Sequence, residues 1–200
     1  MTGPGSPRPT PRRTVVVASS AGGLNALLAV LPALPASFPS PIICVQHVSP
    51  HQPSFLAQIL ERRCAMSVAV AAPGQTPRPG VVLIAPPDHH VILQADGRVD
   101  LWDGPPVNHV RPSADLLFSS AAEVFGDRAV AVVLSGTGHD GAAGAAAVHE
   151  RGGTVLVQSP GTCEFPGMVE ATMRLVEPDG VLPLAEVAPA LQRLAGEVAA

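Results

Sequence analysis

Short apolar runs that alternate with helical segments constrain the fold of this chain most strongly. Runs rich in Val, Ile, Leu and Ala occupy residues 14–19, 41–46, 81–85, 129–135 and 154–159. The segments between most of them carry apolar residues at helical spacing. Continuous apolar strands that are connected by helices are typical of a parallel sheet covered on both faces. We therefore predict an α/β fold, with a doubly wound, mostly parallel sheet and helices on both faces.

One segment departs from this alternation. Residues 90–102 form two alternating runs around Asp96-Gly97, a pattern that predicts a β-hairpin, which we place at an edge of the sheet. Residues 1–13 are rich in Pro and Arg and lack the apolar stretch of a secretory signal, so we expect a flexible tail followed by one catalytic domain over 14–200. Predicted helices cover 24–31, 54–64, 113–125 with Ser113 as the N-cap, 141–151, 164–175 and 185–198.

The composition excludes several function classes. The chain has no Lys and no Tyr, so a Lys Schiff base, a P-loop lysine and a Ser-Lys dyad are ruled out. A net charge of −4 and 3% aromatic residues disfavour nucleic-acid binding. Three widely spaced cysteines form no disulfide or metal-binding pattern, and no apolar run is long enough to span a membrane. These features favour a cytoplasmic protein that is not inserted in a membrane.

Three chemically complementary residues follow three of the predicted strands. Ser20 follows the first strand, His47 follows the second, and Asp140 lies just after the strand at 129–135. Ligands of doubly wound folds bind at the carboxyl ends of the strands. A Ser, a His and an Asp at one edge of a sheet are the residue types of a catalytic triad. We therefore predict Ser20 as nucleophile, His47 as base and Asp140 as the group that orients His47.

The chemistry of such a triad explains why these side chains are needed together. A Ser hydroxyl is a weak nucleophile near neutral pH and requires an imidazole to accept its proton. A carboxylate on the other ring nitrogen fixes the tautomer and stabilises the imidazolium. Ala21 and Gly22 open a helix, whose first N–H groups have no partner within the helix and can stabilise an oxyanion.

Each of these residues also has a simpler interpretation. Ser20 and Asp140 are also suited to cap helices, and the segment around Ser20 could hold a phosphate or nucleotide instead. His139 is a weaker candidate base than His47, because it adjoins Asp140. His47 and His51 have a zinc-like spacing, but Pro50 argues against a helix there. The convergence of three residue types on one sheet edge favours the triad.

Several motifs in the same order resemble those of a known family. They are VVVASSAGGLNAL around Ser20, ICVQHV around His47, and Ala85-Pro86 followed by Asp88-His89-His90. Further motifs are DGPPVNHVRPS at Asp103–Ser113, LSGTGHDGAAG at Leu134–Gly144 and CEFPGM at Cys163–Met168. Together they resemble the catalytic domain of the chemotaxis protein-glutamate methylesterase family, CheB. The resemblance extends from about residue 14 to the C-terminus.

The resemblance implies a reaction and a set of partners. It implies hydrolysis of glutamyl γ-methyl esters on chemoreceptor helices, with release of methanol, and deamidation of certain glutamines. By the same resemblance Ser20, His47 and Asp140 take the triad roles, and the backbone N–H of Thr137 helps to hold the oxyanion. The implied partners are a methylated protein substrate and a separate receiver or signalling protein, and no metal or organic cofactor is implied. Arg111 is a candidate for binding a substrate carboxylate, with a structural salt bridge as the alternative.

The sequence departs from the family pattern at three points. Only 19 residues precede Ser20, so we expect no receiver domain in this chain. Thr137 stands where the family commonly has Met, and Val169 stands where Pro often follows the preceding Gly-Met. These two departures bear on substrate preference more than on the triad. A phosphate- or nucleotide-binding module and an inactive scaffold with the same fold remain the alternative hypotheses.

Overall fold

A seven-stranded parallel sheet forms the centre of the molecule. The computed structural model describes residues 13–48 and 54–196, so the predicted tail lies outside the described residues except for Arg13. The strands follow the order β3-β4-β2-β1-β7-β8-β9, and every neighbouring pair is parallel. The predicted α/β fold is confirmed. The strands are β1 Thr14–Ser19, β2 Ile42–Gln46, β3 Ser67–Val70, β4 Val81–Ile84, β7 Ala129–Val133, β8 Thr154–Gln158 and β9 Gly180–Leu182.

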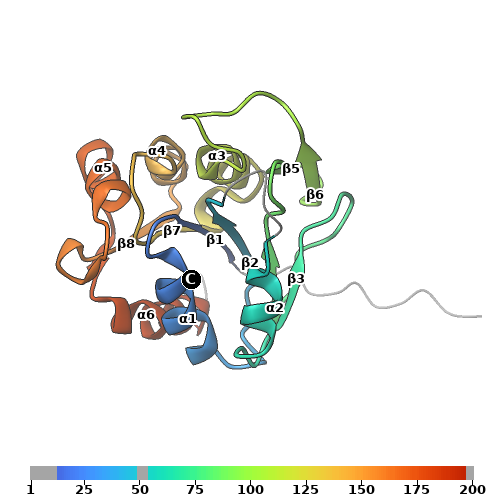
Figure 1. The fold of residues 1–200 in the computed structure, drawn as a ribbon, viewed down its shortest axis with the longest axis horizontal. Coiled ribbons are helices and arrows are strands. Elements are labelled where there is room, and N and C mark those ends of the chain that lie inside the picture. The colour runs from blue at the N-terminus through green and yellow to red at the C-terminus, as the bar shows by residue number, and fades with distance from the viewer. Residues whose placement is uncertain (1–12, 49–53, 197–200) are drawn as a thin grey trace, which may run out of the picture.

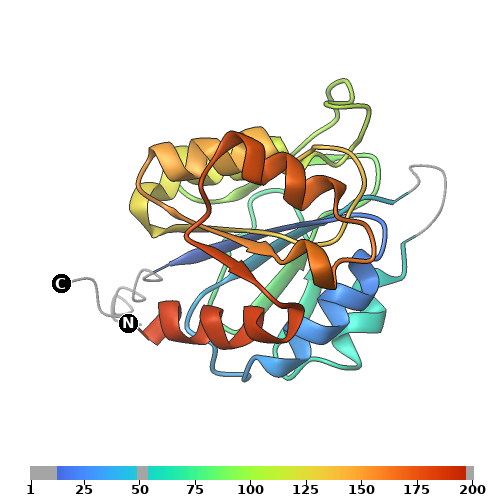
Figure 2. The same ribbon diagram turned by 90° about the vertical axis from the view of Figure 1, so that its left-hand side faces the viewer.

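Helices cover both faces of this sheet, as Figures 1 and 2 show. Helices α3, α4 and α5 lie on one face, and α1, α2 and α6 lie on the other. Alternate residues of β1 supply the two cores: Val16 and Ala18 pack on the first side, and Val15 and Val17 on the second. The helices are α1 Gly23–Val30, α2 Leu56–Glu61, α3 Ala114–Phe125, α4 Ala142–Glu150, α5 Gly167–Leu175 and α6 Leu184–Gly196.

The predicted hairpin is present, but it forms a separate sheet. Strands β5 (His90–Leu93) and β6 (Val99–Trp102) pair only with each other and pack beside α3. They are connected through Gly97, which has a φ of 79°, a conformation that favours glycine. The predicted hairpin is thus confirmed, and its strands are not hydrogen-bonded to the main sheet.

The two edge strands of the sheet were not predicted. Strand β3 has four residues that are all at least partly exposed, and β9 has only three residues. Neither has the continuous apolar run that marks a strand buried on both faces. The prediction for 54–64 was also too long, because α2 ends at Glu61, and α5 begins three residues later than expected, at Gly167.

The order of the strands determines which loops meet. Strand β1 lies at the centre, between β2 and β7, and pairs with both in parallel. The chain leaves β1 towards β2 on one side, whereas β7 and β8 continue the sheet on the other side. Such a reversal of strand order opens a crevice at the carboxyl ends of the strands. The residues that follow β1, β2 and β7 therefore meet there. In the described part of the chain, no helix has the length and apolar character needed to cross a membrane.

Candidate active site

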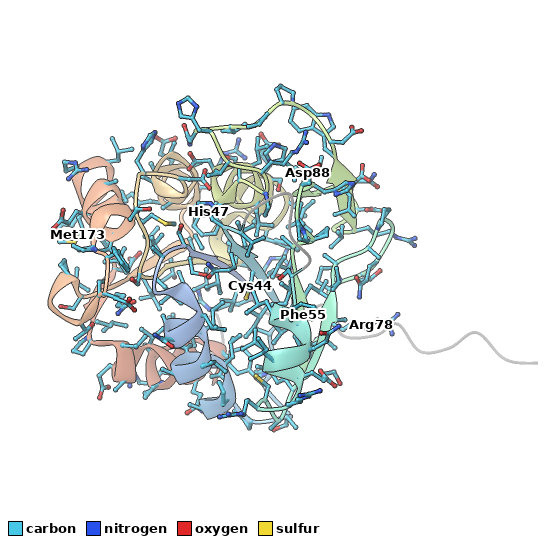
Figure 3. All side chains as sticks on the ribbon, viewed as in Figure 1. Cys44, His47, Phe55, Arg78, Asp88 and Met173 are labelled. Carbon is cyan, nitrogen blue, oxygen red and sulfur yellow. The ribbon has the colours of Figure 1, made fainter. Side chains whose placement is uncertain are left out.

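Ser20 is held at the end of β1 by main-chain hydrogen bonds to its neighbours. Its N–H donates to the carbonyl of Ser135, and its carbonyl accepts from the N–H of Gly23 at the start of α1. His47 follows β2, and its N–H donates to the carbonyl of Ser19. The parallel register therefore places Ser20 and His47 on adjacent strand ends. His47 lies between the two helical layers in Figure 3.

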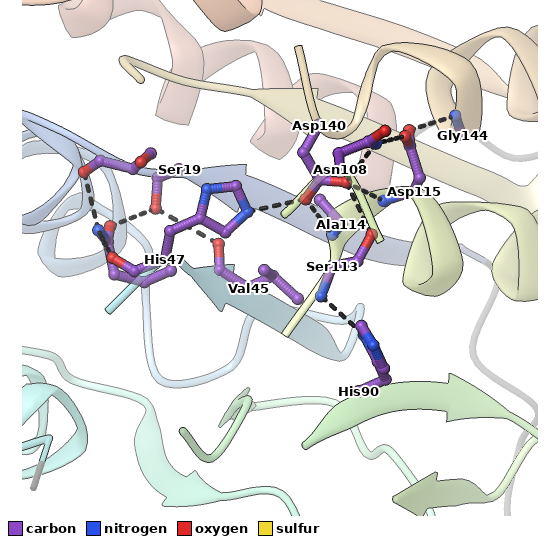
Figure 4. A network of polar contacts seen from close by, with 12 residues as sticks. Ser19, Val45, His47, His90, Asn108, Ser113, Ala114, Asp115, Asp140 and Gly144 are labelled. Carbon is purple, nitrogen blue, oxygen red and sulfur yellow. Dashed lines mark hydrogen bonds and ion pairs between the residues drawn. The ribbon is translucent and has the colours of Figure 1, made fainter. Parts of the chain in front are cut away.

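His47 and Asp140 form a close pair, as Figure 4 shows. The Nε2 atom of His47 lies 2.7 Å from Oδ2 of Asp140. The side chains are 10% and 3% exposed, respectively, so water screens this contact only weakly. When Nε2 carries the proton and donates a hydrogen bond to Asp140 Oδ2, the lone pair of Nδ1 is free to act as a base. The pair thus has the form that a base and its orienting carboxylate require.

The Asp140 carboxylate accepts several further hydrogen bonds from the start of α3. Ser113 Oγ donates to Oδ1 at 2.7 Å, and the N–H of Ala114 donates to Oδ2 at 2.6 Å. The N–H of Asp115 and the amide of Asn108 lie farther away, each at 3.3 Å from Oδ1. Asp140 therefore caps α3 from a distant part of the chain, and its negative charge lies at the positive end of that helix.

This arrangement corrects two expectations about helix caps. Ser113 occupies the N-cap position of α3, as predicted, but its side chain makes no capping hydrogen bond and donates to Asp140 instead. Asp140 does not cap the helix that follows it, because Gly141 is the N-cap of α4 and Asp140 binds α3. Sequence reasoning considers neighbouring residues, whereas these contacts join segments 26 and 27 positions apart.

These hydrogen bonds control the ionisation of Asp140. Burial by itself raises the pKa of this carboxyl group. The hydrogen bonds from His47, Ser113 and the Ala114 N–H outweigh burial, so the pKa of Asp140 falls below its usual range. Asp140 is therefore ionised at neutral pH and can stabilise a protonated His47.

The hydroxyl of Ser20 is not bonded to His47 in this state. Within residues 13–48 and 54–196, the Ser20 side chain makes no hydrogen bond. Catalytic hydrogen bonds are often long in a free enzyme and shorten only when substrate is bound. The structure brings the backbone of Ser20 next to that of His47, and it pairs His47 with Asp140.

The N–H groups expected to hold an oxyanion have no other partner in the part of the chain that the structure describes. Those of Ala21, Gly22 and Thr137 donate no hydrogen bond to any described residue. Thr137 belongs to the loop after β7, and this loop approaches Ser20 closely. A Cβ on Gly136 would lie 2.9 Å from Cβ of Ser20 and 2.1 Å from Sδ of Met168. Glycine at 136 therefore permits the close approach of the loop.

Arg111 is used within the protein. Its Nε donates to Asp88 Oδ1 at 2.9 Å, and its Nη1 donates to the carbonyls of Asp103 and Gly104 at 2.8 and 2.7 Å. The structural salt bridge is thus present. Arg111 also lines a small cleft of about 120 Å³ together with His47, Asp88 and His109. The cleft adjoins His47, so a role of Arg111 towards substrate stays a prediction.

A family model decides the classification of this chain. The model described as CheB methylesterase matches residues 15–191, which include all of the site residues. The chain belongs to the CheB methylesterase family.

Curated relatives in this family carry consistent names. A protein-glutamate methylesterase/protein-glutamine glutaminase of Symbiobacterium thermophilum is 40% identical over 94% of this chain and 52% of the relative. A putative enzyme of that name in Leptospira interrogans is 36% identical over 90% of this chain and 93% of the relative. The protein-glutamate methylesterase FrzG of Myxococcus xanthus is 37% identical over 92% and 55%. The chain thus spans about half the length of several relatives that it matches.

A solved structure has the same fold. The catalytic domain of the Thermotoga maritima CheB methylesterase superposes with a TM-score of 0.88 at 37% identity, covering 91% of this chain and 98% of that domain. At this level of similarity the two chains share the same fold over most of their length.

The remaining candidate residues have different positions. His139 is exposed and lines a cleft of about 240 Å³ with Asn108, Asp115 and Arg174. His51 lies outside the described residues, so the structure does not test its pairing with His47. Val169 lies in α5 and is fully buried in the core, whereas Thr137 is exposed in the loop after β7.

Sequence reasoning missed the residues that support Asp140. His90 is fully buried, and its Nδ1 accepts a hydrogen bond from the N–H of Ser113 at 3.0 Å, while its Nε2 donates to the carbonyl of Pro105. Burial is the main reason why the pKa of His90 is lowered, so its neutral form is favoured. Asn108 links Asp140 to Asp115. His90 and Asn108 both lie in motifs that resemble those of the family, but their spacing in the sequence does not indicate a contact with Asp140.

The cysteines are poor candidates for the nucleophile. Cys44 is fully buried within β2, as expected for a core residue, and burial raises the pKa of its thiol. Burial also raises the pKa values of Cys64 and Cys163 to about 11. Thiols with such pKa values are almost entirely protonated near neutral pH and react slowly. Ser20 therefore remains the candidate nucleophile of the site.

Proposed function

We propose that this chain hydrolyses γ-methyl esters of glutamyl side chains in chemoreceptor-like proteins. Ser20 acts as the nucleophile, His47 as the base, and Asp140 as the carboxylate that orients His47. The contact between His47 Nε2 and Asp140 Oδ2, at 2.7 Å, is the main observation in support. Membership of the CheB methylesterase family and the names of its relatives supply the substrate class.

The proposed reaction uses these groups in sequence. Ser20 Oγ attacks the ester carbonyl carbon and transfers its proton to Nδ1 of His47. The N–H groups of Ala21, Gly22 and Thr137 stabilise the oxyanion. The C–O bond then breaks, His47 returns the proton to the leaving methoxide, and methanol departs. A water molecule then gives a proton to His47 and attacks the acyl-enzyme. The bond from the acyl carbon to Ser20 Oγ breaks, Oγ takes the proton back from His47, and the released glutamic acid side chain ionises. A glutamine amide follows the same route and releases ammonia.

A phosphate- or nucleotide-binding role has less support from the site. The start of α1 offers N–H groups to an anion, but the side chain of Glu164 lies against Gly22. A Cβ placed on Gly22 would lie 2.8 Å from Cβ of Glu164 and 3.0 Å from its Oε2. A carboxylate at this position repels phosphate. A neutral ester or amide does not meet this repulsion.

The experiment that tests the proposal uses a fluorophosphonate probe, which reacts with activated serines. We expect the parent chain to be labelled and Ser20→Ala to be unlabelled, with both proteins equally folded by circular dichroism. Labelling that persists in Ser20→Ala would exclude Ser20 as the nucleophile. A rise in melting temperature with a nucleotide, in a chain that the probe does not label, would favour the phosphate-binding alternative.

A further inference from the structure

Gln46, the last residue of β2, connects the two strand ends that carry Ser20 and His47. Its Nε2 donates to the carbonyl of Ser20 at 2.8 Å and to the carbonyl of His47 at 3.1 Å. Its Oε1 accepts a hydrogen bond from Ser19 Oγ at 2.6 Å. The side chain is 9% exposed. A single buried amide therefore contacts the main chain of both the nucleophile and the base.

We propose that Gln46 is a positioning residue, which sets the spacing between Ser20 and His47. The proposal rests on the proposed hydrolase function and adds a residue that touches neither substrate nor the reacting atoms. Gln46 does not line the cleft beside His47, which supports a role through the main chain rather than through substrate binding.

The orientation of the Gln46 amide is fixed by its partners. The Ser19 hydroxyl donates to Oε1, whereas two carbonyl oxygens accept from Nε2. Turning the amide over would place Oε1 against both carbonyls, and these contacts would repel. The packing is also tight, because a Cβ on Gly23 would lie 2.2 Å from Oε1 of Gln46. Glycine at position 23 therefore leaves the space that the amide occupies.

The need for such a link follows from the local hydrogen bonding. Ser20 and His47 are each the first residue beyond a strand, and the ladder between β1 and β2 ends at Ser19 and Gln46. Beyond that point the hydrogen bond from His47 N–H to the Ser19 carbonyl, together with Gln46, joins the two segments. The Ser20 hydroxyl must reach Nδ1 of His47, and a displacement of 1 Å can reduce catalysis by about 100-fold. The Gln46 amide thus restricts the motion of Ser20 relative to His47, on which proton transfer depends.

The main test is the variant Gln46→Met, which keeps the length of the side chain and removes all three hydrogen bonds. We expect the rate of labelling by a fluorophosphonate probe to fall by about 10- to 100-fold. In ester hydrolysis we expect kcat to fall with KM nearly unchanged, because the substrate cleft is intact. Gln158→Met is the matched control. Gln158 is also a buried amide at a strand end, and it binds Ser135 N–H and the Thr162 carbonyl instead.

Comparison with Gln158→Met separates the effect of lower stability from the effect of displacing Ser20 relative to His47. Both variants lose a buried amide with several partners, so we expect similar falls in melting temperature. Labelling should be at least tenfold slower in Gln46→Met than in Gln158→Met. Equal rates in the two variants, or a Gln46→Met rate within twofold of the parent rate, would overturn the role of Gln46.

A second variant, Gln46→Glu, is tested by the pH dependence of its labelling rate, which a general loss of stability does not explain. The introduced carboxylate, when ionised, cannot donate to the two carbonyls and is repelled by them, whereas its protonated form donates one hydrogen bond. Burial between carbonyls raises the pKa of such a group. The ratio of the variant rate to the parent rate should therefore rise as pH falls from 8 to 5.5. A ratio that does not change with pH contradicts the proposal, even if Gln46→Met fails to fold.

The two proposals fail in different ways. A parent chain that the probe does not label removes the proposed function, and the role of Gln46 falls with it. A parent chain that is labelled through Ser20, with no specific loss in the Gln46 variants, removes only the positioning role.

Discussion

The Nε2 atom of His47 lies 2.7 Å from Oδ2 of Asp140, although 93 positions separate these residues in the chain. The same carboxylate accepts a hydrogen bond from the N–H of Ala114 at the start of α3. The proposed base is therefore linked, through one carboxylate, to a helix on one face of the sheet. The dipole of α3 and the hydroxyl of Ser113 help to keep Asp140 ionised, which is the state that stabilises a protonated His47.

We expect Ser113→Ala to lower kcat even under conditions in which the variant is fully folded. The substitution removes a 2.7 Å hydrogen bond to a buried carboxylate, an interaction that contributes about 1.5–3 kcal/mol. Asp140 should then hold His47 less firmly, and kcat for ester hydrolysis should fall by about tenfold. Urea unfolding and steady-state kinetics measure the two effects.

Ser120→Ala is a control for this prediction on the same helix. Ser120 Oγ donates to the carbonyl of Leu117 and accepts from the N–H of Leu93, far from Asp140 in the hydrogen-bond network. It should lose a similar amount of stability and retain the parent kcat. Equal falls in kcat for the two variants would show that Ser113 has no specific connection to the site.

The central part of the fold was predictable because its signals are local. Strands β1, β2 and β7 are continuous apolar runs, and burial on both faces requires such a composition. The edge strands β3 and β9 lacked this signal because they are short and partly exposed. Asp96-Gly97 identifies the hairpin, whereas its packing against α3 could not be predicted, because local sequence does not say which helix a hairpin contacts.

The site was predictable to a smaller extent. Topology alone places Ser20, His47 and Asp140 at neighbouring strand ends, and the structure adds the contact between His47 and Asp140. The contacts of Ser113 and Gln46 depend on side-chain geometry between distant segments, so spacing in the sequence could not indicate them. The triad roles themselves stay predictions until Ser20 is tested.

We expect Gly22→Ala to destabilise the chain and to impair the site. Gly22 has a φ of 72°, which alone costs alanine about 1–2 kcal/mol. The new Cβ would also lie 2.8 Å from both Glu164 Cβ and Ser135 Oγ. Movement to relieve these contacts should displace the N–H groups beside Ser20 and slow ester hydrolysis by at least tenfold. Thermal unfolding and kcat are the measurements.

Gly138→Ala separates backbone strain from steric contact. Gly138 has a φ of 84°, yet apart from its chain neighbours no atom of the described residues would lie within 4 Å of a Cβ there. This variant should show the strain alone and lose less stability than Gly22→Ala. If the two variants lost equal stability, the steric contacts around Gly22 would not contribute to the loss of stability in Gly22→Ala.

Stability should fall as the pH is lowered from 7 to 5, in part because of His90. The pKa of folded His90 is lowered by burial, so between that pKa and about 6.5 the unfolded chain binds a proton that the folded chain does not. The contribution of His90 to this loss is absent above about pH 6.5 and grows as pH falls to the lowered pKa. Urea unfolding across this range should show a weaker pH dependence in His90→Gln than in the parent.

Asp140 should affect the free energy of unfolding at a lower pH than His90 does. Its pKa is lowered in the folded state, so its stabilising effect is present above about pH 4 and is lost as pH falls towards the lowered value. Asp140→Asn should therefore show less acid destabilisation than the parent below about pH 4. A parent and an Asn variant with the same slope in this range would argue against an ionised, hydrogen-bonded Asp140.

Cysteine reagents should react slowly with the folded chain. Cys64 and Cys163 have thiol pKa values raised to about 11, and Cys44 is buried. Only roughly one thiol in ten thousand with such a pKa is ionised at pH 7. We expect alkylation by iodoacetamide to be at least tenfold slower than that of glutathione. Rapid alkylation that also blocks probe labelling would point to a cysteine nucleophile.

Release of methanol from a methylated chemoreceptor tests the proposed function most directly. The parent chain, Ser20→Ala and Asp140→Asn are incubated with the same methylated receptor, and methanol and the glutamyl esters that remain are quantified by mass spectrometry. We expect the parent to release methanol, Ser20→Ala to release none above the uncatalysed rate, and Asp140→Asn to be at least 100-fold slower than the parent. Equal release by the parent and by folded Ser20→Ala would contradict the assignment of Ser20 as nucleophile.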